Sequence, residues 1–370
     1  MRDMAGFSLS VGMPNAPLHC AAHSHHPWPD VSFAGQQAAW NDAARLLDHK
    51  WDHIFSDVIP RAQRHIARRL SLPDPASVTF APNTHSFVLR LLSCLPSKPR
   101  ILTTASEFMS FSRQIARLEE DGLVSVTRVA TEPFDTFEAR FAAAATQGGH
   151  DLVFLSQVFF DSGFRVGDLA RIVRSVPGDK TFVVIDGYHG FMAVPTDVSA
   201  IASRAFYLAG GYKYAMAGEG VCFLHCPPGY GPRPRDTGWY TGFTALESGA
   251  SGVPYAADGS RFLGATFDAS ALYRFNAVQD WLADRSVDAM LEQVRALERR
   301  FLSRTKLTPL IAEESARGRF LCFRTDDAGA ITGRLAAQNI LVDHRGDRLR
   351  ISFGIYHTEA DVDRLAEALT

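Results

Sequence analysis

The stretch TFVVIDGYHG, residues 181–190, decides how this chain folds. Its first five residues favour a buried strand, Asp186 follows directly, and His189 comes three residues later. Twenty-seven residues beyond Asp186, the stretch AGGYK at 209–213 ends in Lys213. The spacing predicts a carboxylate at the end of one core strand and a lysine after a glycine turn that follows another.

Two apolar runs, 206–209 and 221–224, flank Lys213 and are typical of buried strands, so we expect the lysine near a cleft. Most lysines are solvated surface charges, and most aspartates after a strand are turn formers or helix caps. The position between two core strands favours a covalent role instead. Lysines condense with the aldehyde of pyridoxal phosphate, which also needs a carboxylate facing its pyridine nitrogen. We therefore expect Lys213 and Asp186 to fill these two roles.

Length and composition are those of an ordinary globular protein. The chain has 370 residues, 46% hydrophobic and 21% charged, enough for a large domain and a smaller one. The net charge is -2 and the basic residues are spread out, which argues against nucleic acid or a membrane as partner. A small-molecule partner is expected. The chain has no long apolar run, and its first residues lack an apolar leader, so we expect a cytoplasmic protein.

The cysteines and histidines do not predict a metal site. The five cysteines are scattered, without the spacing of a redox or metal-binding pair, and are expected to be reduced thiols. His19, His23, His25 and His26 cluster near the N-terminus, but no carboxylate flanks them before Asp30. A role at the substrate or at an interface is favoured for this cluster.

Strand-like and helix-like segments alternate along most of the chain, which predicts an α/β fold with a mainly parallel sheet. Ligands of such sheets bind beyond the carboxyl ends of the strands. Polar residues follow the expected strands at Asn83, Thr84, Gln157, Asp186 and His189, so they are expected at one edge. The expected strands are 77–80, 100–104, 123–126, 151–155 and 181–185, and the expected helices are 36–47, 51–70, 112–121 and 166–175.

The segment after the first of these strands, residues 81–86, carries amide and hydroxyl side chains where a helix begins. A helix start offers free backbone N–H groups and the positive end of the helix dipole, which favours a phosphate. A plain helix cap by Asn83, Thr84 or Ser86 explains the same residues, and both interpretations stay open.

The pattern changes after about residue 285, where a compact α+β domain is expected. It contains a long helix at 287–302, shorter helices at 331–338 and 359–369, and strands at 340–342 and 349–352. We therefore expect an N-terminal segment at 1–35 that contributes to the site or the small domain, a large domain at 36–285, and a small domain at 286–370.

The order of these motifs resembles the class V aminotransferase group of fold-type I pyridoxal phosphate enzymes, and within it kynureninase most of all. The likeness covers roughly residues 75–365. It implies a large domain with a mainly parallel seven-stranded sheet and a small α+β domain. The segments that carry the resemblance are Asp186 to His189, Tyr212-Lys213, Phe108 to Ser110, Gly238 to Tyr240 and Val342 to Ser352.

The resemblance implies a role for each matching residue. Lys213, Asp186 and His189 would be catalytic, and Arg350 would bind the substrate carboxylate in a bidentate manner. Ser24 would lie near the aryl end of the substrate. A homodimer with shared active sites is also implied, with Trp239 and Thr266 reaching the partner's site. The implied cofactor contacts are Asn83, Thr84, Phe108, Ser110, Asp186, His189, Tyr212, Lys213, Trp239 and Thr266.

The sequence departs from the resembled pattern at two places. Tyr188 stands where the family usually has a small residue against one face of the cofactor ring. The N-terminal segment at 20–29 keeps Ser24 but replaces its neighbours with histidines.

The leading hypothesis is hydrolysis of kynurenine or a related β-keto amino acid to alanine and an aryl acid. The alternative is a class V aminotransferase acting on an unidentified amino acid. Cysteine desulfuration is disfavoured because no cysteine stands just ahead of Arg350 and the nearest, Cys322, is in an apolar strand. A non-catalytic protein of the same fold is the least favoured hypothesis, because Lys213, Asp186 and Arg350 are all present. The natural substrate stays open.

Overall fold

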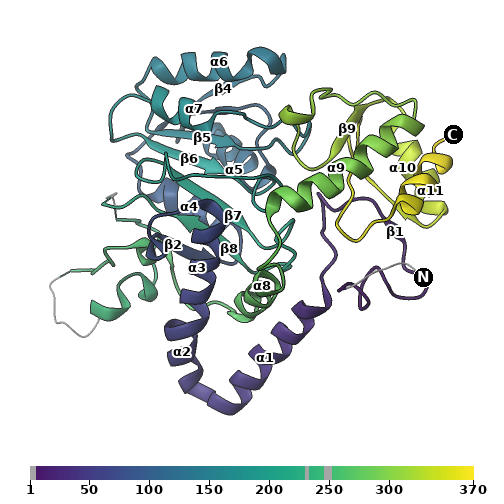
Figure 1. Cartoon of the computed structure of the whole chain (residues 1–370). Coiled ribbons are helices and arrows are strands. Elements are labelled where there is room, and N and C mark those ends of the chain that lie inside the picture. Colours follow the sequence, from purple (N-terminus) through teal and green to yellow (C-terminus); the bar gives the residue numbers. More distant parts are fainter. Residues whose placement is uncertain (1–5, 230–232, 246–251) are drawn as a thin grey trace.

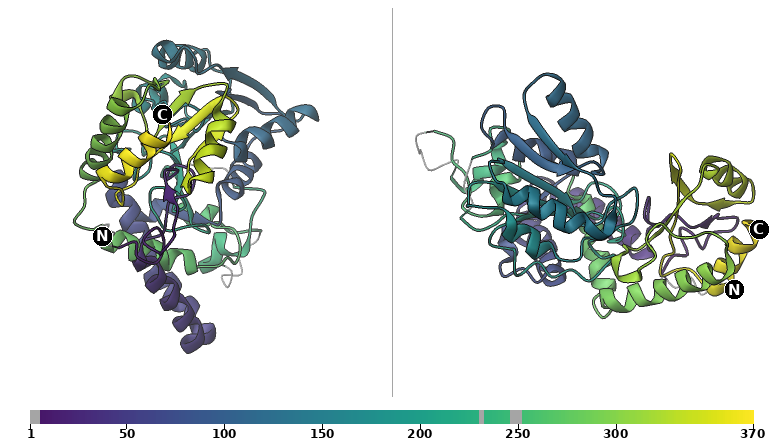
Figure 2. Two further views of the ribbon diagram at one scale, coloured as in Figure 1. Left: turned by 90° about the vertical axis from the view of Figure 1, so that its right-hand side faces the viewer. Right: turned by 90° about the horizontal axis from the view of Figure 1, so that it is seen from above.

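The computed structural model describes residues 6–229, 233–245 and 252–370, so the first five residues, where a leader was sought, lie outside the described part. The large body is built on a central sheet, and a smaller body holds the C-terminus and the first described residues (Figure 1). Seen from above, the two bodies lie side by side, and helix α9, Val287–Arg304, runs along the smaller one (Figure 2).

The central sheet has seven strands in the order β2-β8-β7-β6-β5-β3-β4. Only β8 runs antiparallel to its neighbours, and the other pairs are parallel. This confirms the predicted α/β fold with a mainly parallel sheet. The strands are β2 Val78–Ala81, β3 Arg100–Thr104, β4 Ser125–Val129, β5 Leu152–Ser156, β6 Phe182–Asp186, β7 Phe206–Gly210 and β8 Cys222–His225.

Helices cover both faces of this sheet because successive strand side chains point to opposite sides. In β6, Val183 and Ile185 belong to the apolar core that includes α3, α6, α7 and α8. Phe182 and Val184 belong to the core on the other side, with α4 and α5. These helices are α3 Ile59–Leu70, α4 Thr84–Ser93, α5 Met109–Glu120, α6 Phe134–Thr146, α7 Leu169–Ser175 and α8 Ser270–Trp281.

Three helical regions differ from the sequence-based expectation. Helix α1, Asp30–Leu46, begins six residues before the expected start at 36 and projects with α2, Lys50–His53, away from the sheet (Figure 1). Helices α6 and α8 were not predicted. The residues of α8 are buried on most sides, so this helix lacks the polar face that makes a helical period visible in sequence.

The small body contains a three-stranded antiparallel sheet in the order β11-β12-β9 and helices α9, α10 and α11. Strand β1 near the N-terminus pairs in parallel with β10, although more than 300 residues separate them in sequence. Residues 18–21 therefore lie beside the C-terminal part of the chain. The remaining bounds are β1 Leu18–His19, β9 Leu321–Arg324, β10 Ile340–Leu341, β11 Asp343–Arg345, β12 Arg348–Ile351, α10 Ala328–Ala337 and α11 Glu359–Ala368.

None of the described helices combines the length and the apolar character needed to cross a membrane. Histidine, cysteine and carboxylate side chains do not form a metal-binding group of three or more anywhere in the described ranges. The boundaries at 35 and 285 stay predictions.

Candidate active site

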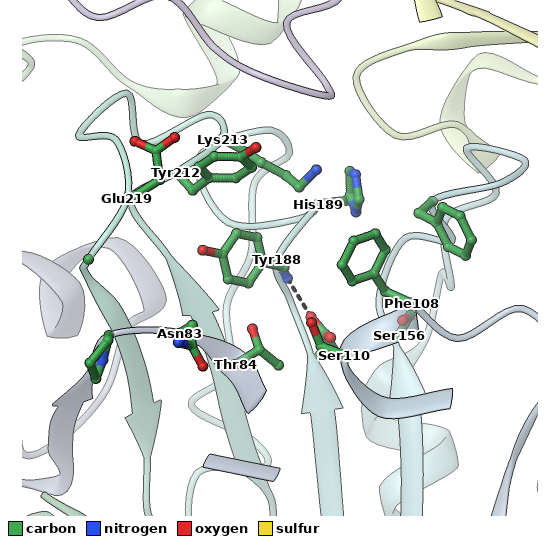
Figure 3. A pocket seen from close by; sticks show the side chains of 14 residues that line it. Asn83, Thr84, Phe108, Ser110, Ser156, Tyr188, His189, Tyr212, Lys213 and Glu219 are labelled. Carbon is green, nitrogen blue, oxygen red and sulfur yellow. Dashed lines mark hydrogen bonds between the residues drawn. The ribbon is translucent and has the colours of Figure 1, made fainter. Parts of the chain in front are cut away.

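A cavity of about 570 Å³ lies beyond the carboxyl ends of β5, β6 and β7, within the size range of small-molecule sites (Figure 3). It brings together eight of the implied cofactor contacts and adds six further residues, of which the sequence had singled out Tyr188 as a departure from the resembled pattern. The first group is Asn83, Thr84, Phe108, Ser110, Asp186, His189, Tyr212 and Lys213, and the second is Pro82, Ser156, Phe160, Tyr188, Glu219 and Gly220.

Lys213 follows β7 after the Gly210-Gly211 turn and is almost completely buried, at 8% exposure. Its Nζ donates a hydrogen bond of 2.8 Å to the backbone oxygen of His23. Burial, and then the positive charge of Arg350, lowers the pKa of Lys213 from 10.5 to about 7. A large fraction of this amine is therefore unprotonated at neutral pH and able to attack an aldehyde.

Asp186 is the last residue of β6 and is buried. Its Oδ1 accepts a hydrogen bond of 2.9 Å from the backbone N–H of Tyr188. Burial raises the pKa of Asp186 to about 6, with a smaller opposing effect of Lys213. Among the described residues no cation pairs with this carboxylate, so Asp186 suits a ligand that brings a positive charge, such as a protonated pyridine nitrogen.

His189 lies close to Lys213 on the cavity wall (Figure 3). Burial, followed by the charges of Lys213 and Arg350, lowers the pKa of His189 well below its ordinary value, so the ring is neutral. Its Nε2 has no hydrogen-bond partner among the described residues. A buried ring nitrogen without a partner is costly unless a ligand completes it, which fits a polar ligand in the cavity.

The lower wall of the cavity is formed by the starts of α4 and α5. Asn83 caps α4, because its Oδ1 accepts a hydrogen bond of 3.0 Å from the N–H of Ser86. Asn83 is therefore the helix cap that the sequence suggested, and the first backbone N–H groups of α4 stay available for an anion. Thr84 and Ser110, in the first turns of the two helices, line the cavity. Their hydroxyl groups can donate hydrogen bonds to a phosphate.

Two aromatic rings border the central space of the cavity. Figure 3 shows Tyr188 and Phe108 on opposite sides of a space below the Lys213 amine, which lies beside His189. Tyr188, which replaces the small residue of the resembled family, needs Gly210 beside it. A Cβ at position 210 would lie 2.5 Å from the Tyr188 hydroxyl oxygen, so a larger residue there would displace the ring. A flat ligand ring between Phe108 and Tyr188 would have an aromatic neighbour on both sides.

Arg350 reaches this region from β12 of the small body and is buried, at 3% exposure. Its Nη1 donates a hydrogen bond of 2.5 Å to the backbone oxygen of Phe160, whose side chain lines the cavity. Its Nη2 forms an ion pair of 2.6 Å with Asp343 Oδ2. Neither Arg350 nor Ser24, the two expected substrate contacts, is among the residues that line the cavity, and Arg350 adjoins it through Phe160.

His23 is the residue of this region that sequence reasoning did not single out by itself. Its backbone oxygen accepts the Lys213 hydrogen bond, and its Nδ1 lies 2.8 Å from the Ser352 hydroxyl. Its ring stacks on Phe320, with centroids 4.8 Å apart. Only the density of histidines at 19–26 indicated that this segment was special, because its position depends on the distant β1–β10 pairing.

The four clustered histidines have different neighbours. His19 Nδ1 lies 3.1 Å from the Tyr356 hydroxyl, and His26 Nδ1 donates to the oxygen of Pro27. The His25 ring contacts the Tyr212 hydroxyl at the cavity. Together with His23 they connect the N-terminal segment to both bodies.

Trp239 and Thr266 contact each other, with Trp239 Nε1 donating a hydrogen bond of 3.1 Å to Thr266 Oγ1. Neither residue lines the cavity of its own chain. Their predicted contribution to a partner's site stays a prediction.

The described cysteines are all free thiols, and none of them lines the cavity. Burial raises the pKa of Cys322 to about 11, and its Sγ donates to the backbone oxygen of Asp161 at 3.3 Å. A buried thiol of this kind is a poor nucleophile.

Comparisons with known proteins agree with this geometry. The family described as "Aminotransferase class-V" matches residues 36–365. Isopenicillin N epimerase of Streptomyces clavuligerus is 30% identical over 365 residues, 88% of this chain and 88% of that protein.

Solved structures share the fold across nearly the whole chain. A lysine-to-alanine mutant of C-DES, with glycine covalently linked to its PLP cofactor, has a TM-score of 0.82 at 18% identity, covering 100% of this chain and 99% of that chain. The apo cysteine desulfurase of Thermococcus onnurineus NA1 has a TM-score of 0.82 at 14% identity, covering 98% of this chain and 96% of that chain. At these identities the likeness establishes the fold and not the reaction.

Proposed function

Because this chain belongs to the class V aminotransferase family, whose fold-type I members use pyridoxal 5′-phosphate, we propose that it acts on an α-amino acid with Lys213 as the covalent anchor of the cofactor. The buried amine of Lys213, the unpaired carboxylate of Asp186 and the free start of α4 match the aldehyde, pyridine nitrogen and phosphate of this group.

Each of these residues has a defined task in the reaction. The bound cofactor supplies an electron sink for charge that develops at the substrate's α-carbon. Lys213 accepts the α-proton at Nζ, which its lowered pKa allows near neutrality. Asp186 keeps the positive charge at the pyridine nitrogen, and neutral His189 donates or accepts one hydrogen bond at the ring. Arg350 holds the α-carboxylate and so fixes which bond at the α-carbon is oriented for cleavage.

The reaction that we place first is hydrolytic cleavage of a β-keto amino acid of the kynurenine type. The observation that supports this reaction best is an aromatic wall beside Arg350, formed by Phe160 and Phe108. The Phe160 backbone binds Arg350, and its ring packs edge-to-face on Phe108 at 5.3 Å. An aryl side chain on a substrate held by Arg350 would meet this wall. Water adds to the γ-carbonyl, the bond between the β- and γ-carbons breaks, and alanine and an aryl acid leave.

The second candidate is amino transfer or inversion at the α-carbon. Both reactions use the same proton transfer by Lys213 and the same carboxylate contact, and the relative named as an epimerase supports this candidate. Cysteine desulfuration has less support, because none of the described cysteines lines the cavity. A homodimer that places Trp239 and Thr266 at the partner's cavity is part of the proposal.

The test is an incubation of the cofactor-loaded enzyme with L-kynurenine and with 3-hydroxykynurenine, first without and then with a keto acid. Products are followed by mass spectrometry in deuterium oxide, with Lys213→Ala as the inactive control. Alanine and an aryl acid without keto acid would support hydrolysis. Loss of the amino group only with keto acid would support transamination, and deuterium at the α-carbon with inverted configuration would support epimerisation. Intact substrate without any α-deuterium would refute action on this class.

A further inference from the structure

The substrate-binding arginine already holds a carboxylate of its own chain. Arg350 Nη2 and Asp343 Oδ2 are 2.6 Å apart, and both side chains are largely buried, at 3% and 10% exposure. The strand pairing explains the contact, because Asp343 of β11 lies directly opposite Arg350 of β12. A charge-assisted pair with this little solvent is stronger than a surface pair.

Asp343 binds Nη2, the nitrogen that both bidentate edges of the guanidinium share. A guanidinium binds a carboxylate with two N–H groups, either through Nε and Nη2 or through Nη1 and Nη2. Nη2 belongs to both edges. In Arg350, Nη1 donates to Phe160, whereas Nε has no partner among the described residues. The Nε–Nη2 edge therefore has one nitrogen without a partner, and a substrate carboxylate on this edge would share Nη2 with Asp343 or displace it.

A second arginine, Arg345, also contacts Asp343 and can bind its carboxylate away from Arg350. Arg345 Nη1 lies 2.9 Å from the other carboxylate oxygen of Asp343, and the Arg345 side chain is 49% exposed. This arginine can follow a small rotation of Asp343 at little cost. His23 Nε2, buried and without a hydrogen-bond partner among the described residues, lies 3.9 Å from Asp343 Oδ2.

We propose that Asp343 is a displaceable internal carboxylate, which pairs with Arg350 in the free enzyme and moves onto Arg345 when a substrate α-carboxylate binds. This inference rests on the proposed function, in which Arg350 receives that carboxylate. Asp343 spares the buried Arg350 an uncompensated charge while no substrate is present. It also selects for ligands that bind in a bidentate manner, because a weaker single contact does not replace it. Asp343 is thus a specificity-determining residue.

The experiment compares two probes on the cofactor-loaded enzyme, L-phenylalanine and L-phenylalaninamide, which differ in the carboxylate alone. Affinity is measured by titration calorimetry. Asp343→Asn should tighten L-phenylalanine binding about tenfold and leave the amide unchanged, because the competing charge is gone. Asp347→Asn, a nearby exposed carboxylate on the same hairpin, is the matched control and should change neither affinity. Weaker or unchanged binding of L-phenylalanine to the Asp343 variant would overturn the proposal.

A double-mutant cycle with Arg345 gives a second and independent test. Arg345→Gln should weaken L-phenylalanine binding several-fold when Asp343 is present and have no effect in the Asp343→Asn background. Equal effects in both backgrounds would overturn the displacement. Arg350→Gln separates this outcome from a failure of the proposed function. If that variant binds L-phenylalanine as the wild type does, Arg350 is not the carboxylate site and the function itself is misplaced.

Discussion

The two halves of the candidate site, the edge of the large sheet and the adjoining small body, handle their charges in opposite ways. On the large sheet, Lys213 and Asp186 are buried without an ion-pair partner among the described residues, and their pKa values shift toward each other, to about 7 and about 6. On the small body, Arg350 is paired in advance with Asp343. In the proposed function, this difference means that the cofactor half is completed by a group that stays, whereas Arg350 exchanges its partner in every cycle.

The largest expected effect comes from removing the amine of Lys213. Lys213→Ala abolishes the covalent anchor and the base at the α-carbon, so turnover should fall by at least ~10³-fold. Intact-protein mass spectrometry after borohydride reduction measures the anchor, and the kynurenine incubation measures turnover. Lys180→Ala, at an exposed lysine, is the matched control and should retain both. A cofactor still reducibly attached to the Lys213→Ala protein would show that the two halves have been assigned wrongly.

Replacing Arg350 on the substrate half should reduce activity less than replacing Lys213, because the cofactor chemistry stays intact. Arg350→Gln should raise KM for an α-amino acid by about 10- to 100-fold, the range for one charge-assisted bidentate contact, with a lesser effect on kcat. Steady-state kinetics on the substrate found in the incubation measure both constants. Arg348→Gln, on the same strand but paired with Glu132, tests for a general effect on the hairpin. If both variants behave alike, the contrast between the halves fails.

The free energy of unfolding of the cofactor-free protein should depend on pH, because Lys213 is buried without an ion-pair partner among the described residues. The pKa of Lys213 is lowered from 10.5 to about 7, so the folded state disfavours its proton. The destabilisation is complete below about pH 7 and disappears as the pH rises toward 10.5, where the amine is neutral in both states. Lys213→Met should therefore raise the free energy of unfolding at pH 7 by about 2 kcal/mol, less than the ~5 kcal/mol of the full shift because packing and one hydrogen bond are lost.

Urea unfolding of both cofactor-free proteins at pH 7, 8 and 9 measures that difference. The advantage of the Met variant should shrink steadily across the series, since only the wild type gains stability from losing the lysine proton. A difference that stays constant with pH would mean that the pKa of Lys213 is not lowered in the fold and that its amine stays protonated in both states across this range.

The same contrast between halves explains what the sequence could predict. Asp186 and Lys213 belong to strand-and-turn patterns of a few residues, so their place at the sheet edge follows from local periodicity. The contacts of His23 with Lys213 and Ser352 depend on the β1–β10 pairing across more than 300 residues, which no local pattern encodes. The pairing of Asp343 with Arg350 requires the register of a short hairpin whose first strand was not predicted.

The smallest expected effect concerns Tyr188, which belongs to the cofactor half and stands where the resembled family has a small residue. If its ring is one wall of a slot for the cofactor ring, Tyr188→Ala removes one aromatic contact. Such contacts contribute about 0.5–1.5 kcal/mol, so the dissociation constant of the cofactor should rise about two- to tenfold. Equilibrium dialysis of a substrate-free sample measures it. Gly210→Ala is the informative partner variant, because its methyl group would lie 2.5 Å from the Tyr188 hydroxyl and 2.8 Å from the Val221 backbone oxygen, so the Tyr188 ring would have to shift. It should weaken the cofactor more than Tyr188→Ala does, and its effect should diminish in the double variant, where the displaced ring is absent. Additive effects of the two changes would mean that Tyr188 merely fills space beside Gly210 and that the slot has a single aromatic wall, Phe108.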